Sequence, residues 1–276
     1  MRSILYVTLA ASLAANVFLG LRFLPGCLHD VAASSADPAS GTGTAAANAA
    51  GGAYLKLQNV RFFWSDEISV ETRDLSVRAV PIAPHTSVDF DNVAAYRLEL
   101  LNGDAKLRLT TLQHILNTVV FAYDGSPLRS LKLSTRGDRL IIQGELDFVL
   151  WLGFEMTARL SLSEDKRTLL IDSEGGTALG MPFAGDLLSS IGLDLEALVP
   201  VPPDHPLQLT GNRMIVDPYR LFPQPSFTGN LAAIQLNADH LRLSFRDSRR
   251  VAFPEAPVPE STSGLYIYQG GVKFGK

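Results

Sequence analysis

A two-residue alternation of apolar and polar side chains constrains the fold of this chain more than any other feature. Residues 140–148 carry an apolar or small side chain at every second position, and residues 154–162 repeat the pattern more regularly. A period of two places successive side chains on opposite faces of a β-strand. The alternation therefore predicts two strands, each with one face toward a core and one toward water.

Short polar segments separate these strands from their neighbours. Arg136-Gly137-Asp138 precedes the first strand, and Glu164-Asp165-Lys166 follows the second. Tight polar turns of this kind join antiparallel strands. The same criteria predict further strands at 67–79, 96–101, 106–110, 129–135, 168–174, 207–216, 231–236, 240–246 and 265–274.

Two segments have helical periodicity instead. After the capping candidates Thr110 and Thr111, apolar residues recur at helical spacing as far as Tyr123, and Asp124-Gly125-Ser126-Pro127 ends the run. A second helix is predicted over 184–198. Its apolar side carries Leu187, Leu188, Ile191, Leu195 and Leu198. The predicted fold class is α+β, in which two amphipathic helices cover the apolar face of a long antiparallel sheet.

Such a sheet has more apolar surface than two helices can cover. A helix is about 10 Å wide, so a sheet of about eight or more strands must curl around the helices. Two outcomes stay open: side chains fill the core completely, or an elongated apolar groove remains that accepts an acyl chain. The predicted lipid-binding residues of this groove are Leu116, Val119, Val120, Phe148, Phe154, Met156, Leu187, Leu188 and Ile191.

The N-terminus carries a membrane segment. Residues from Ile4 to Leu21 include no charged side chain and would span about 27 Å as a helix, close to the roughly 30 Å of a bilayer core. We expect a retained anchor over residues 1–25, because a signal-peptide core is usually shorter. Cleavage near Val31-Ala32-Ala33 and lipidation at Cys27 are the alternatives.

A tether follows the anchor. Residues 26–53 are rich in Ala, Gly, Ser and Thr, and from Ala32 onward they contain no large apolar side chain, so they predict a flexible linker before a domain over 54–276. Cys27 is the only cysteine, which excludes an internal disulfide. The net charge of −4 argues against a nucleic-acid binder and against a basic face for anionic lipid.

Several segments between Thr111 and Asp247 together resemble a known family. They are the helix at 112–128, the paired strands at 131–146 and 154–171, and the segments 181–199 and 211–245. In order and spacing they are similar to the LmeA-like phospholipid-binding proteins of bacterial envelopes, within the tubular lipid-binding (TULIP) superfamily. The resemblance covers about half the chain. It implies a long curved sheet wrapped around a helix, an apolar groove for lipid tails and no catalytic chemistry.

One connection departs from that family. Residues 148–153 read Phe-Val-Leu-Trp-Leu-Gly, where similar proteins carry a polar loop. Loops normally face water. The second helix could cover this loop, or its tip could enter a bilayer, and Leu150, Trp151 and Leu152 are the predicted membrane contacts.

Motifs of common enzymes are missing. The sequence contains no G-x-S-x-G elbow, no H-E-x-x-H and no G-K-[ST] phosphate loop. His85, His114 and His205 are scattered, and Asp89 with Asp91 fits a solvated edge. We therefore expect no catalytic residues, no cofactor and no metal.

Two function classes remain. The first is a lipid-binding or lipid-transfer protein of the bacterial envelope, anchored by its N-terminus with the domain on the periplasmic side, whose partners are a phospholipid or other acyl lipid and the membrane. The second is a non-catalytic scaffold with a fully packed core that presents a strand edge to a protein partner. Co-purification of phospholipid distinguishes them.

Overall fold

The computed structural model describes residues 52–147, 150–178, 181–183, 194–246, 263–270 and 272–273. The predicted membrane helix, residues 26–51 of the predicted linker, Phe148 and residues 184–193 of the predicted second helix lie outside these ranges. The last residue of the predicted linker, Ala53, begins the first strand. The described chain is mostly antiparallel sheet with few helices, which confirms the sheet-rich α+β class. None of its helices is long and apolar enough to cross a membrane.

The first of two seven-stranded sheets in the described chain combines its early and late parts. Its strands run in the order β13-β14-β4-β2-β1-β15, and β12 pairs with β4 in parallel. Their bounds are β1 Ala53–Phe63, β2 Ser69–Pro81, β4 Tyr96–Arg108, β12 Ser226–Gly229, β13 Leu231–Leu236, β14 His240–Arg246 and β15 Gly264–Gln269. A separate parallel pair joins β3 (Val88–Asp89) to β16 (Val272–Lys273).

The second sheet is built from one continuous part of the chain between β4 and β12. Its order is β10-β11-β8-β7-β6-β5, with β9 on β8, and every pair is antiparallel. The bounds are β5 Leu128–Arg136, β6 Arg139–Asp147, β7 Trp151–Leu162, β8 Leu169–Ala178, β9 Met181–Phe183, β10 Leu207–Thr210 and β11 Arg213–Val216. The predicted turn at Gly137-Asp138 joins β5 to β6.

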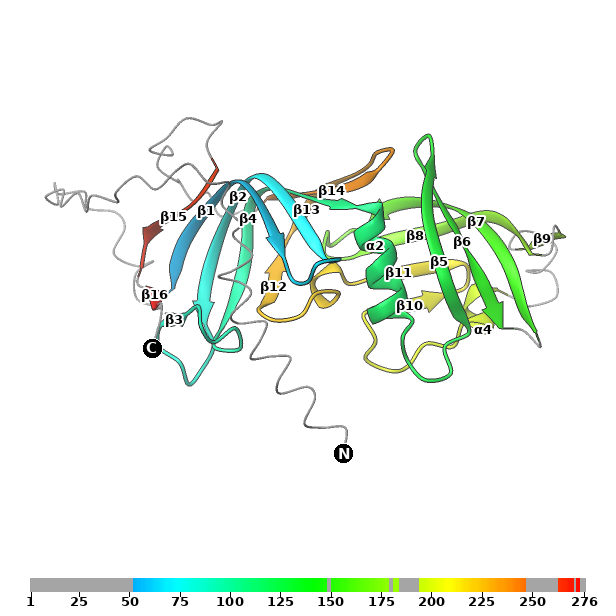
Figure 1. Cartoon of the computed structure of the whole chain (residues 1–276), viewed down its shortest axis with the longest axis horizontal. Coiled ribbons are helices and arrows are strands. Elements are labelled where there is room, and N and C mark those ends of the chain that lie inside the picture. The colour runs from blue at the N-terminus through cyan, green and yellow to red at the C-terminus, as the bar shows by residue number, and fades with distance from the viewer. Residues whose placement is uncertain are drawn as a thin grey trace, which may run out of the picture.

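The two sheets lie side by side along the long axis of the molecule, and α2 (Leu109–Ile115) lies where they meet (Figure 1). Hydrogen bonds join the sheets: the Leu231 amide donates to the Lys166 carbonyl over 2.9 Å, and the Thr135 hydroxyl donates to the Ala238 carbonyl over 3.1 Å. Buried apolar side chains from both sheets belong to one hydrophobic cluster. A single core therefore runs through both halves.

The predicted strands 96–101 and 106–110 are one strand, β4. The sequence Asn102-Gly103-Asp104 suggests a turn, but the chain passes through it in a β-bulge with Gly103 at φ 124°. A Cβ at Gly103 would lie 2.0 Å from the Asp74 carbonyl oxygen, so only glycine fits. The segment 207–216 was predicted as one strand, but it forms two. A turn at Gly211 (φ 56°) divides it into the hairpin β10–β11.

The first helix begins earlier than predicted. It starts at Leu109, so Thr110 and Thr111 lie inside the first turn and do not cap it. The cause is that β4 runs directly into the helix, and the Leu109 amide donates to the Asp239 carbonyl over 2.9 Å. After α2 the helix continues as a π-helical turn, η2 (Leu116–Val120). The described part of the predicted second helix holds one turn, α4 (Leu195–Leu198), and η3 (Pro218–Arg220) is a 3-10 turn.

Candidate functional site

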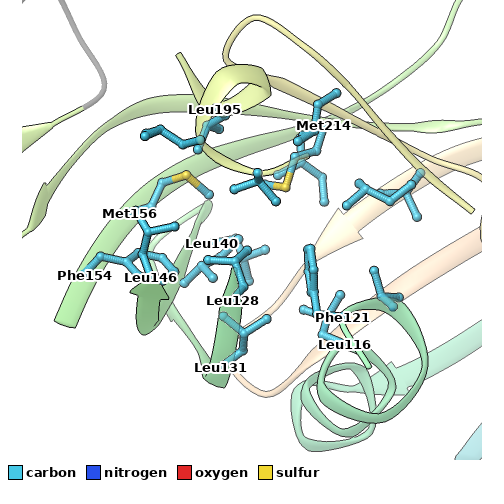
Figure 2. Close-up of a pocket in the computed structure, with 18 residues that line it drawn as sticks. Leu116, Phe121, Leu128, Leu131, Leu140, Leu146, Phe154, Met156, Leu195 and Met214 are labelled. Carbon is cyan, nitrogen blue, oxygen red and sulfur yellow. The ribbon is translucent and has the colours of Figure 1, made fainter. Parts of the chain in front are cut away.

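An apolar cavity lies between the helix α2–η2 and the second sheet (Figure 2). The space left between the side chains has a volume of about 80 Å³. All of the described residues that line it are apolar. They are Leu116, Val120, Phe121, Leu128, Leu131, Leu140, Ile142, Leu146, Phe154, Met156, Ile171, Leu195, Leu198, Val199, Leu207, Leu209, Met214 and Val216.

The alternation of β6 and β7 builds one wall. Leu140, Ile142 and Leu146 of β6 face the cavity, and Phe154 and Met156 of β7 lie beside them, since Ile142 pairs with Met156 across the ladder. Packing explains why glycine occupies position 144 in this series. A Cβ there would lie 2.7 Å from the Leu131 side chain and 3.1 Å from the Phe154 ring. Glycine thus allows these two side chains to meet over the strand.

The opposite wall comes from α4 and the β10–β11 hairpin, as Figure 2 shows for Leu195 and Met214. Asp194 caps α4, because its carboxylate accepts a hydrogen bond from the Ala197 amide over 3.0 Å. Sequence reasoning missed the contribution of β10 and β11. The signal was present, because Leu207, Leu209, Met214 and Val216 follow the period of two, but a single strand was predicted there.

Side-chain amides seal the free edge of β5 against the helix. The Leu131 amide donates to Asn117 Oδ1 over 2.8 Å, and Asn117 Nδ2 donates to the Leu131 carbonyl over 2.9 Å. One turn earlier, Gln113 Oε1 accepts from the Leu133 amide over 3.2 Å. An edge strand normally leaves such groups unpaired. Here the helix takes the place that a further strand would occupy.

The π-helical turn lies at this seam. Leu116 and Val120 of η2 both line the cavity, and the Phe121 amide donates to the Leu116 carbonyl over 2.8 Å in the i to i+5 pattern. Beyond it, the Tyr123 hydroxyl donates to the Pro200 carbonyl over 2.8 Å, and its ring packs edge-on against His205. The segment after the helix is thereby fixed to the segment before β10.

Four of the predicted lipid-binding residues meet at this cavity: Leu116, Val120, Phe154 and Met156. Val119 does not line it and is 42% exposed, because the wide π-helical turn places it on the outer side. The remaining predicted residues, Phe148, Leu187, Leu188 and Ile191, lie outside the described residues.

The predicted membrane loop is shorter than expected, because β7 begins at Trp151 and pairs it with Asp147. Leu150 is 71% exposed in the turn, and Trp151 is 38% exposed. The guanidinium carbon of Arg129 lies 3.7 Å from the centre of the Trp151 ring, which is a cation–π contact on the outer face of the sheet. Leu152, one residue further along the strand, points to the opposite face and is half-buried. Among the described residues of the predicted loop, the exposed apolar side chains are therefore Leu150 and Trp151.

None of the described residues that line the cavity has a titratable side chain. His114 lies in the last turn of α2, and Asp89 accepts a hydrogen bond from the Asp91 amide over 3.1 Å in a local turn. The described residues contain no group of three or more His, Cys, Asp or Glu side chains that could hold a metal ion. What this site offers is an apolar surface.

The chain matches no family model, no curated protein and no solved structure. Its function is therefore inferred from its own residues and their geometry.

Proposed function

We propose that this protein binds the acyl chain of a phospholipid, or of a similar lipid, in the apolar cavity of the second sheet, without catalytic chemistry. One observation carries the proposal: 18 apolar side chains, from six strands, from two helical turns and from the residue that follows each turn, face a single space. A site built to orient a polar substrate would place polar groups among them. The expected family, the LmeA-like proteins, holds lipid tails between a curved sheet and a helix, and the seam at Asn117 supports that arrangement here.

The cavity must widen to hold a chain, and its walls suit this. Met156 and Met214 lie on opposite sides, and methionine side chains adapt to irregular shapes because they are unbranched and flexible. The wall that carries Met214 also includes the single helical turn α4, and the side toward the helix includes the π-helical turn η2. Such short or irregular elements shift at lower cost than a long helix.

The proposed location follows from the N-terminal residues. An anchor over residues 1–25 and a linker over 26–53 would hold the domain at the outer side of a bacterial inner membrane, where phospholipid is the adjacent ligand. Leu150 and Trp151 would then be the part of the second sheet that touches the bilayer.

A scaffold protein is the competing proposal, and one observation favours it. The space left in the cavity, about 80 Å³, is smaller than the roughly 300–1,000 Å³ of ordinary small-molecule pockets. In that case the side chains in Figure 2 are simply a core, and the protein acts through its surface.

The deciding experiment is mass spectrometry of an organic extract of the purified protein, with a variant that fills the cavity. Met156→Trp should remove co-purifying lipid while circular dichroism still shows a folded sheet. Thr157→Trp is the matched control, because the neighbouring side chain points to the outer face of the same strand and should leave the lipid load unchanged. Absence of lipid from the parent protein, or equal lipid in both variants, would refute the acyl-chain proposal.

A further inference from the structure

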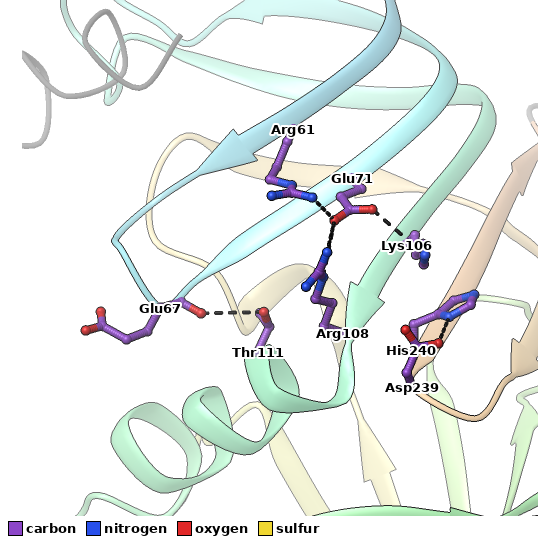
Figure 3. A network of polar contacts seen from close by, with 8 residues as sticks. All are labelled: Arg61, Glu67, Glu71, Lys106, Arg108, Thr111, Asp239 and His240. Carbon is purple, nitrogen blue, oxygen red and sulfur yellow. Dashed lines mark hydrogen bonds and ion pairs between the residues drawn. The ribbon is translucent and has the colours of Figure 1, made fainter. Parts of the chain in front are cut away.

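A second cavity lies on the outer face of the first sheet and shares no lining residue with the apolar cavity. It has a volume of about 490 Å³. We name it the basic cleft, and its lining residues are Asn59, Val60, Arg61, Glu71, Thr72, Arg73, Asp104, Lys106, His240 and Arg242. Figure 3 shows that β1, β2, β4 and the start of β14 each bring a charged or polar side chain to it. Between them, Leu107 and Leu241 point the other way and are buried.

Cations outnumber carboxylates in this cleft. Four of its side chains are Arg or Lys and two are Asp or Glu, an excess of two positive charges before any contribution from His240. The whole chain, in contrast, carries a net charge of −4. A concave surface lined by one sign of charge focuses the field and attracts the opposite charge. The local excess therefore favours an anionic ligand.

The carboxylate Glu71 is shared among several cations. It binds Arg61, accepts a hydrogen bond from Arg108 over 3.1 Å and lies 3.9 Å from Lys106 Nζ (Figure 3). Partial burial raises the pKa of Glu71, but the charges of Arg61, Arg108 and Lys106 outweigh this and hold the pKa below its ordinary value. One carboxylate is thus shared by three cations. It cannot accept from all of their N–H donors, so some of these donors stay available to a ligand.

Two cations of the cleft have the most donor capacity to offer. Lys106 lies beyond hydrogen-bond distance of Glu71. Arg73 is exposed and makes no ion pair within the part of the chain that the structure describes. The other two arginines are paired: Arg61 binds Glu71, and Arg242 donates to Asp104 over 2.9 Å. An incoming anion would find Lys106 and Arg73 without having to break these pairs.

We propose that the basic cleft binds a phosphate group. Arg and Lys are the side chains that bind phosphate oxygens, through charge-assisted hydrogen bonds. The polar lining is unsuited to an acyl chain, and the volume accommodates a phosphate together with a small esterified alcohol. Free phosphate and the headgroup of a glycerophospholipid share this chemistry. The site lies on the other sheet from the apolar cavity, so it does not depend on the acyl-chain proposal.

Isothermal titration calorimetry of the full chain, in a non-ionic detergent at low ionic strength, tests the inference. The probes are inorganic phosphate and sn-glycerol 3-phosphate, with sodium chloride as the reference. We expect both phosphates to bind, and the double variant Arg73→Gln/Lys106→Gln to weaken binding about tenfold or more. The control is Arg136→Gln, an exposed arginine of the second sheet that pairs with Glu155 over 3.4 Å and should leave the affinity unchanged.

Each outcome has a defined meaning. Tighter binding of glycerol phosphate identifies the lipid headgroup as the source of the anion, and equal binding identifies free phosphate. If neither probe gives a heat of binding with the parent protein, the inference is overturned, and no variant is needed. It is equally overturned if Arg136→Gln weakens binding as much as the double variant, because the effect is then one of general charge.

Discussion

Replacing Asn117 by alanine should open the seam between the helix and the second sheet. The Asn117 amide accepts from the Leu131 amide and donates to the Leu131 carbonyl, and it also donates to the Gln113 carbonyl over 2.8 Å. Leu131 is only 2% exposed, so water reaches its backbone poorly. Alanine would leave two buried backbone groups of the edge strand without a partner.

The magnitude follows from those two groups. An unsatisfied buried donor or acceptor costs about 1–3 kcal/mol, or about 2–6 kcal/mol for the pair. Asn117 itself is half-buried, so water recovers part of this, and alanine gains roughly 0.5 kcal/mol of helix propensity. We expect a net loss of about 2 kcal/mol in the free energy of unfolding.

Urea unfolding measures the loss, and hydrogen exchange locates it. The Leu131 amide should exchange faster in Asn117→Ala, whereas amides of β8 should keep their protection. Thr118→Ala is the control on the same helical turn: its hydroxyl bonds only the His114 carbonyl over 2.8 Å and it is exposed, so about 0.5 kcal/mol or less should be lost. A loss below about 0.5 kcal/mol for Asn117→Ala, with the Leu131 amide still protected, would refute the role of this seam.

Three further predictions follow from the geometry. Gly103→Ala should cost at least about 2 kcal/mol because its φ of 124° and its close neighbour exclude a side chain, while Gly153→Ala, with open space around it, should be nearly neutral in urea unfolding. The pKa of Glu71 is lowered on folding, so the ionised carboxylate stabilises the fold above its ordinary pKa of 4.5. This stabilisation is lost as the pH falls through the folded-state pKa. Glu71→Gln should therefore have a lower free energy of unfolding than the parent at pH 7, and this difference should shrink below pH 4.5. Replacing Leu150 and Trp151 together by serine should reduce flotation with phosphatidylcholine vesicles at any salt concentration, measured on the protein without residues 1–51. Equal flotation of both proteins, or loss of the parent's binding in moderate salt, would contradict membrane contact by this turn.

The alternation in the sequence was enough to predict the cavity wall formed by β6 and β7. An alternating strand places its apolar side chains toward the core and its polar side chains toward water. The alternation therefore places Phe154 and Met156 in the cavity wall. The helix was also recognisable from its spacing. Its start was not, because the end of β4 rather than a capping side chain determines where it begins.

Features that depend on distant pairing could not be predicted. β1 alternates at Leu55 and Leu57, but Asn59 with φ 49° breaks the period, and the strand was not assigned. The basic cleft combines single residues such as Arg61, Lys106 and Arg242 from strands far apart in the chain, so no local pattern marks it. Asn117 did leave a signal, as a polar residue within the apolar run of the helix, but its partner could be named only from the fold.

The order of the strands has a consequence for synthesis on the ribosome. The second sheet is complete once Val216 has emerged, because all its strands from Leu128 onward are neighbours in the chain. The first sheet is completed later. Strand β4 can pair with β14 only after Arg246 has been synthesised, and β1 can pair with β15 only after Gln269. Until then the half-built first sheet exposes unpaired strand edges next to a finished neighbour. Strands β1, β2 and β4 are synthesised first, but their sheet is completed last. We therefore expect these strands to need protection from aggregation in the nascent chain.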